Sequence, residues 1–148
     1  MKTKRLDIKI STLVLLLIFT LIGSKALAQD QFVIIANADV PVESIDKSTI
    51  KRIYNGFTTQ WKNSTKVKPC YMQIQNDAFW KYMGTTKTNF NKFWTKRVFS
   101  GNGVSPVEHG SSAALVKYVS EISGAIGILR IEDQKLAEGN CKILQKTN

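Results

Sequence analysis

The stretch Ile45–Trp61, IDKSTIKRIYNGFTTQW, decides the fold of this chain. Asp46 is a suitable N-cap residue, and Gly56 is a suitable residue to end a helix. Between them, four apolar residues recur at the spacing i, i+3, i+4, i+7, which places them on one helix face: Ile50, Ile53, Tyr54 and Phe57. The stretch therefore predicts a short capped helix that leads the chain to Trp61.

Apolar segments on both sides of this helix predict strands. Phe32–Asn37 (FVIIAN) is a continuous apolar run, which is typical of a strand buried on both faces, as in a parallel sheet. Lys66–Ile74 (KVKPCYMQI) predicts a second strand. It begins at Pro69 or lies at an edge, because proline cannot donate to a ladder. A strand–helix–strand unit thus forms the centre of the predicted fold.

The rest of the chain adds helices and strands to this unit. Apolar periodicity and flanking glycines predict helices over Asp77–Met83 and Thr88–Phe99, and a third that opens at Gly110-Ser111-Ser112. The last two strands are Ala125–Leu129 and Cys141–Gln145. The expected buried helix residues are Phe79, Trp80, Met83, Phe90, Phe93, Trp94, Val98, Leu115, Tyr118, Val119 and Ile122. This order predicts an α/β fold with a small, mostly parallel sheet flanked by helices.

Residues 1–28 have the pattern of a cleaved secretory signal peptide. A basic start precedes an apolar run, Ile10–Gly23, and a small-x-small site, Ala26-Leu27-Ala28. An uncleaved N-terminal anchor is the alternative. Cleavage after Ala28 leaves residues 29–148, which is the length of one domain, and predicts a periplasmic or secreted protein.

The mature chain is moderately basic. Of 21 Lys and Arg and 11 Asp and Glu, five and one lie in residues 1–28, so 16 and 10 remain, for a net charge of +6. A basic excess suits a small anionic ligand, although the lysines are spread along the chain, as on an ordinary solvated surface. Export and the helical spacing of the aromatic residues argue against a nucleic-acid partner.

Two cysteines remain, Cys70 and Cys141. In an oxidising compartment they are a candidate disulfide, and two separate buried thiols in two strands are the alternative. Neither a CxxC redox motif nor a Cys/His pattern for a metal is present. The sequence therefore predicts no metal site and no cofactor.

Polar residues near the predicted strand ends are the candidate ligand-binding residues. In open α/β sheets, ligands bind outside the carboxyl ends of the strands, and helix N-termini attract anions. Ordinary helix capping is the alternative explanation of these side chains. The candidates are Asn37, Gln73, Asn76, Ser111 and Ser112.

The sequence gives little indication of an enzyme. It has one histidine, His109, and contains no GxSxG nucleophile motif, P-loop or GxGxxG motif. A hydrolase would need Ser105 or Ser111 within hydrogen-bond reach of His109, with a carboxylate behind it. No catalytic residue is predicted.

Three segments together resemble the small, single-lobe members of the periplasmic phosphate-binding proteins of ABC transporters. They are Val33–Trp61 (VIIANADVPVESIDKSTIKRIYNGFTTQW), Phe93–Pro106 (FWTKRVFSGNGVSP) and Leu115–Leu129 (LVKYVSEISGAIGIL). The resemblance implies one lobe of a type II periplasmic-binding-protein fold and the capture of phosphate or a similar anion. A membrane transporter or sensor would then be the protein partner.

The chain departs from that family in two respects. It has the length of one lobe, and Met72–Asp77 (MQIQND) lacks the Arg and Ser-Gly-Thr with which the family holds phosphate. The alternative function is therefore a ligand-free periplasmic interaction module, accessory to a membrane sensor or transporter. A homodimer that rebuilds the cleft is a further expectation.

Overall fold

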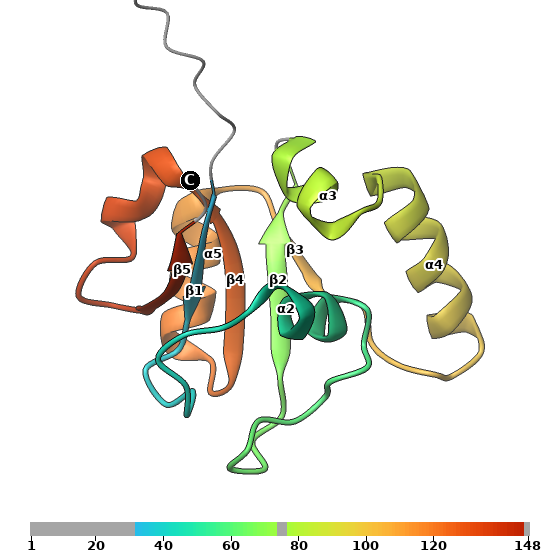
Figure 1. Ribbon diagram of the computed structural model, residues 1–148, viewed down its shortest axis with the longest axis horizontal. Helices are drawn as coiled ribbons and strands as arrows, with labels where there is room; N and C mark the ends of the chain where they lie inside the picture. The colour runs from blue at the N-terminus through green and yellow to red at the C-terminus, as the bar shows by residue number, and fades with distance from the viewer. Residues whose placement is uncertain (1–31, 74–76, 147–148) are drawn as a thin grey trace, which may run out of the picture.

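The computed structural model describes residues 32–73 and 77–146, which form a five-stranded sheet with helices on both faces (Figure 1). The strand order is β3-β2-β4-β1-β5. The strands are β1 (Phe32–Ala36), β2 (Lys68–Met72), β3 (Val107–His109), β4 (Ala125–Arg130) and β5 (Lys142–Lys146). The helices are α2 (Lys47–Tyr54), α3 (Asp77–Met83), α4 (Lys87–Phe99), α5 (Ser112–Glu121) and the 3₁₀ helix η1 (Ile131–Leu136). The predicted fold class is confirmed.

Strand β1 runs against the other four strands. It is antiparallel to both of its neighbours, β4 and β5, whereas β2 is parallel to β3 and to β4. The sequence correctly predicts that β1 is buried on both faces, because all five of its residues are buried. The expectation that β1 belongs to a parallel sheet is wrong. Burial on both faces depends on the layers that flank the sheet and not on the direction of the strand.

Helix α2 begins and ends where the sequence predicts. The Asp46 carboxylate accepts a hydrogen bond of 3.0 Å from the backbone N–H of Thr49, which satisfies a free donor at the helix start. At the other end, Gly56 has φ +71°, a conformation that glycine adopts without strain. Phe57 is a correction, because its side chain is 60% exposed. The turn at Gly56 takes Phe57 off the helical path, so the spacing no longer places it on the buried face.

Two hydrophobic layers sandwich the sheet. Helices α2, α3 and α4 cover one face with an aromatic-rich cluster, in which Phe79, Trp80, Phe90 and Trp94 are buried. Helix α5 packs on the other face through Leu115 and Val119, with Tyr118 and Ile122 partly buried beside them. Figure 1 shows α2 in front of the sheet and α5 behind it.

Helices α2 and α4 are joined at Trp94. Its indole N–H donates to the Tyr54 carbonyl oxygen over 3.0 Å, and the Tyr54 hydroxyl donates to the Cys70 carbonyl oxygen over 2.7 Å. A Cβ on Gly56 would lie 2.6 Å from the Trp94 ring, so only glycine fits this crossing. Val98, expected to be buried, is 48% exposed, because α4 extends past the sheet and the strands do not cover its last turn.

Strand β3 and the start of β2 complete the sheet. The sequence predicts a loop around Ser105-Pro106, and the three residues of β3 that follow pair with β2 as an edge strand. Pro69 lies at the start of β2, as predicted, one residue before pairing with β3 begins at Cys70. The 3₁₀ helix η1 lies between β4 and β5.

The described residues contain no helix with the length and apolar character needed to cross a bilayer.

Candidate solute-binding site

The carboxyl ends of β2 and β3 lie side by side and define the candidate site. Gln73, the residue after β2, donates its backbone N–H to the His109 carbonyl oxygen over 2.8 Å. Gly110 approaches the Gln73 side chain, because a Cβ at Gly110 would lie 4.0 Å from Gln73 Oε1. The parallel pairing of β2 and β3 therefore brings Gln73 next to the segment that leads into Ser111 and α5.

Ser111 caps α5. Its side-chain oxygen accepts a hydrogen bond of 3.2 Å from the backbone N–H of Ala114, one of the donors that a helix start leaves free. Its hydroxyl proton is not used in any hydrogen bond among the described residues, so it can be donated to a ligand.

The hydroxyl of Ser112 is hydrogen-bonded to a carboxylate. Its hydroxyl donates to Asp133 Oδ2 over 2.5 Å, and Arg130 donates to the same oxygen from two nitrogens, at 3.0 and 2.8 Å. The hydrogen bond from Ser112, followed by Arg130, lowers the pKa of Asp133 below 3.8, so the carboxylate is ionised at neutral pH. The Ser112 hydroxyl, which the sequence predicts as a donor to an anionic ligand, therefore already donates to the Asp133 carboxylate.

Asn37 lies at the opposite end of the strands from Gln73, so its predicted place beside Gln73 is wrong. It follows β1, and because β1 runs against β2 and β4, its carboxyl end lies at their amino ends. The Asn37 side-chain amide donates to the carbonyl oxygens of Val119 and Ser120, both over 2.9 Å, at the end of α5. It accepts the backbone N–H of Asp39 over 3.0 Å, so Asn37 is a buried structural residue.

Asn76 lies outside the described residues. Gln73 and Ser111 are therefore the predicted residues that the structure brings to this edge with donors to spare.

Lys87 is a residue of this edge that the sequence analysis missed. At the start of α4, its ammonium donates to the Gln73 carbonyl oxygen over 2.6 Å and to Glu108 Oε1 over 2.8 Å. The side chains of Lys87 and Glu108 are 37% and 38% exposed, so solvent screens the pair. No pattern in the sequence marks Lys87, because its role follows from the pairing of β2 with β3.

His109 is not assembled into a catalytic site. Its Nε2 atom is buried and has no hydrogen-bond partner among the described residues, and its ring lies 4.9 Å from that of Tyr118. Burial lowers the pKa of His109 below 6.5, which keeps the ring neutral at pH 7. No hydrogen bond joins it to Ser105 or Ser111 in the described part of the chain, so the geometry that a hydrolase needs is not formed.

The two cysteines are free thiols in the structure. Cys70 is buried in the layer beneath α5, and Cys141 packs against the same layer. Burial raises the pKa of both thiols, that of Cys141 to about 11. Cys70 lies in β2, whereas Cys141 is half-buried and comes just before β5, and their pairing stays a prediction. Among the described residues, no group of three His, Cys, Asp or Glu side chains is placed to hold a metal ion.

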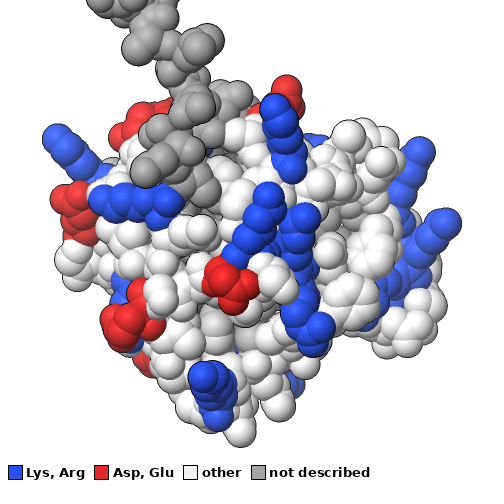
Figure 2. Space-filling view, viewed as in Figure 1, with Lys and Arg blue, Asp and Glu red and all other residues white. Residues whose placement is uncertain are grey.

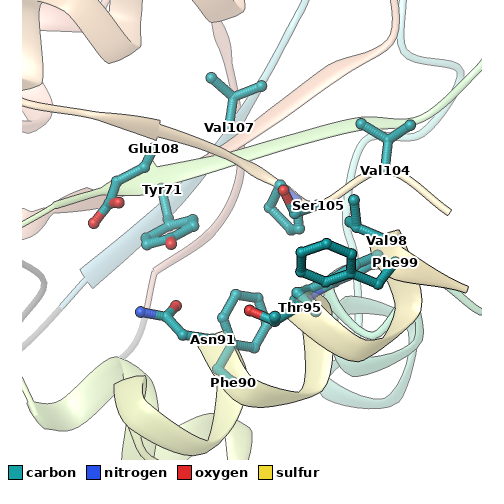
Figure 3. A pocket seen from close by; sticks show the side chains of 12 residues that line it. Tyr71, Phe90, Asn91, Thr95, Val98, Phe99, Val104, Ser105, Val107 and Glu108 are labelled. Atoms are coloured by element: carbon teal, nitrogen blue, oxygen red, sulfur yellow. The ribbon is translucent and has the colours of Figure 1, made fainter.

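A separate apolar groove of about 710 Å³ runs between α4 and residues 104–108 (Figure 3). Phe90, Val98 and Phe99 line it from α4, and Val104 and Val107 line it from the segment that leads into β3. Val98, Phe99, Val104 and Val107 all have large exposed fractions, from 39% to 88%. The groove meets the edge at Gln73 through Glu108, which lines the groove and pairs with Lys87.

Comparison with known proteins gives matches among solved structures alone. No protein-family model matches the chain, and no curated protein does. An ABC-type phosphate transport receptor from Vibrio cholerae matches 78% of this chain at 20% identity and a TM-score of 0.58. The chain has the fold of one lobe of such a protein.

Two further structures agree with this assignment of the fold. A putative phosphate ABC transporter substrate-binding protein from Clostridium perfringens, solved with bound phosphate, has 18% identity and a TM-score of 0.58. A possible phosphate-binding protein from Planctomyces limnophilus has 11% identity and a TM-score of 0.59. Each covers 78% of this chain. The chain spans less than half of each of the three structures: 46%, 44% and 41% of their lengths.

Proposed function

We propose that this chain is an exported, periplasmic solute-binding protein that takes phosphate or a similar small oxyanion. The observation that carries the proposal is the position of Lys87, Gln73 and Ser111 at the carboxyl edge of β2 and β3. Ligands of open α/β sheets bind at such an edge, and the α5 start adds backbone donors to it. The solved structures of the same fold, one with bound phosphate, support the choice of ligand.

Each residue has a distinct role in this proposal. Lys87 supplies the positive charge, as a point charge in place of the family's arginine. Gln73 and Ser111 donate from an amide and a hydroxyl. Glu108 weakens binding of the anion, because its carboxylate already pairs with the Lys87 ammonium. Asp133, held by Ser112, limits how far an anion can move along α5.

Isothermal titration of residues 29–148 with phosphate and with sulfate at low salt tests the proposal. We expect saturable binding of at least one of the two anions. Lys87→Ala should abolish it, and Glu108→Gln should strengthen it, because that change frees the ammonium. Lys117→Ala, on the other side of the sheet, is the matched control. An absence of heat with both anions, or equal losses in the Lys87 and Glu108 variants, would contradict the proposal.

The alternative, an interaction module without a small ligand, is supported by a different observation. The groove between α4 and residues 104–108 exposes large apolar side chains and reaches the candidate anion site only at Glu108. Exposed apolar patches of this kind typically mark contacts with another macromolecule or a membrane. If this alternative holds, titration with phosphate or sulfate gives no heat, and alanine substitutions in the groove abolish binding to the macromolecular partner.

A further inference from the structure

We infer that the end of the molecule at which α2 and α4 terminate docks on an anionic lipid surface. This docking face consists of three apolar tips, Phe57, Phe99 and Val104, and three cations, Arg52, Arg97 and Lys51. Lys51 lines a hollow on α2 together with Phe57, and its ammonium extends from there toward Gly84. The docking face does not depend on the proposed anion site, because the two share no residue.

The apolar tips project into solvent. Phe57, Phe99 and Val104 are 60%, 88% and 87% exposed. Phe57 follows the end of α2, Phe99 is the last residue of α4, and Val104 lies in the loop after α4. Val98, Phe99 and Val104 border one groove, as Figure 3 shows. A bilayer interface accepts such protruding side chains without a shape that complements them, and partly apolar, basic surfaces bind there.

Arg97 links Phe57, at the end of α2, to the end of α4 and the loop that follows it. Its guanidinium lies 5.6 Å from the Phe57 ring and 5.6 Å from the Trp94 ring, and it donates to the Asn102 carbonyl oxygen over 2.9 Å. It therefore holds the end of α2 against the loop that leads to Val104. Its Nε atom is buried without a hydrogen-bond partner among the described residues, so Arg97 still has a donor to satisfy.

A second hollow on α2 continues the face with positive charge. Its lining contains Lys47, Ser48, Lys51, Arg52, Asn55 and Phe57, and no carboxylate. Within residues 32–73 and 77–146, none of Lys51, Arg52 and Arg97 forms an ion pair. Figure 2 shows Lys and Arg side chains gathered over α2 and again over α4, with uncharged surface between them.

The charge pattern decides which partner fits. A second copy of the chain would bring the same cations together, so a symmetric dimer through this face is disfavoured by repulsion. Anionic headgroups neutralise Lys51, Arg52 and Arg97 while the tips enter the interface between them. Basic residues near such a surface contribute additively and lose their effect as salt increases.

Co-sedimentation of residues 29–148 with vesicles tests the inference. We expect binding to vesicles of phosphatidylglycerol and phosphatidylcholine, no binding to phosphatidylcholine alone, and release at high salt. Lys51→Glu with Arg52→Glu should reduce binding by at least about tenfold. Phe57→Ser with Phe99→Ser should also reduce it, without changing the dependence on salt.

Matched controls lie on the other face of the sheet. Lys117→Glu with Lys135→Glu makes the same change in net charge, and Leu136→Ser removes an apolar side chain that is 46% exposed. Both should bind vesicles like the unchanged chain, and so should Lys87→Ala. Failure to bind anionic vesicles, or equal losses in the test and control variants, would overturn the inference. Capture of an acidic protein by this face without vesicle binding would overturn it too.

Discussion

The indole N–H of Trp61 donates to the carbonyl oxygen of Gly124 over 2.9 Å, across 63 positions of the sequence. Gly124 immediately precedes β4, and its carbonyl oxygen also accepts the backbone N–H of Lys68 at the start of β2. The bond therefore fixes the segment after α2 to the start of two central strands. It explains why a tryptophan follows the opening helix at this distance.

Replacing Trp61 with phenylalanine should lower the free energy of unfolding by about 1–2 kcal/mol, because a buried hydrogen bond is lost. The retained bond from Lys68 keeps the loss at the lower end of that range. Urea denaturation measures it. Trp80→Phe is the control for lost ring volume, since no hydrogen bond of its indole is found among the described residues. An equal loss in both variants would mean that the hydrogen bond contributes nothing.

Gly124 should tolerate no side chain. A Cβ there would lie 2.2 Å from the Lys66 carbonyl oxygen, and φ is +74°. Gly124→Ala should therefore cost more than about 3 kcal/mol, from strain and overlap together.

Gly139→Ala is the matched variant, because φ is +78° and a Cβ would meet open space. It should cost about 1 kcal/mol, the strain of the left-handed backbone alone. Thermal unfolding followed by circular dichroism compares the two. Similar melting temperatures would show that the approach to Lys66 does not matter.

Acid should weaken the link between α5 and η1 through Asp133. Its folded pKa is lowered, chiefly by the Ser112 hydroxyl and then by Arg130. The stabilisation is therefore complete above the unfolded pKa of about 4 and is lost as the pH falls through the folded value. Asp133→Asn and Ser112→Ala should both flatten the fall in melting temperature below about pH 4. A profile with the same slope in all three proteins would refute this role.

The two thiols should differ in reactivity. Burial raises the pKa of Cys141 to about 11, so it should react slowly with a maleimide at pH 8, and Cys70 should react only in denaturant. Mass spectrometry after alkylation counts the modified thiols. Two alkylated cysteines in denaturant without reductant are expected. No alkylation until a reductant is added would show that Cys70 and Cys141 pair.

Local patterns predicted the elements well and their directions less well. Caps and periodicity located α2, α3 and α4 to within a residue or two, because these signals are contained in the helix itself. Periodicity misplaces Phe57 because the helix ends before it, at the turn of Gly56, and misplaces Val98 because the pattern does not reveal where the sheet beneath α4 ends. Three residues are too few for β3 to produce a pattern.

The site was harder to predict because it depends on topology. The sequence groups Asn37 with Gln73 only if both strands point the same way, and the reversal of β1 separates them. Lys87 could not be found from the sequence, because it reaches Gln73 and Glu108 only through the pairing of β2 with β3. Ser112 was correctly placed near α5, but its acceptor, Asp133, lies 21 positions later.

The reversed strand β1 also sets the order in which the chain can fold. Phe32 pairs with Arg130 and Val33 pairs with Lys146, so β1 must wait for β4 and β5, which are synthesised much later. Contacts between such distant positions form slowly, because a long loop must close before they are made. Until β4 and β5 have emerged from the ribosome, the apolar segment FVIIA has no partner strand. The growing chain therefore leaves this buried strand unpaired, and open to chaperones, until residues 125–146 have been synthesised.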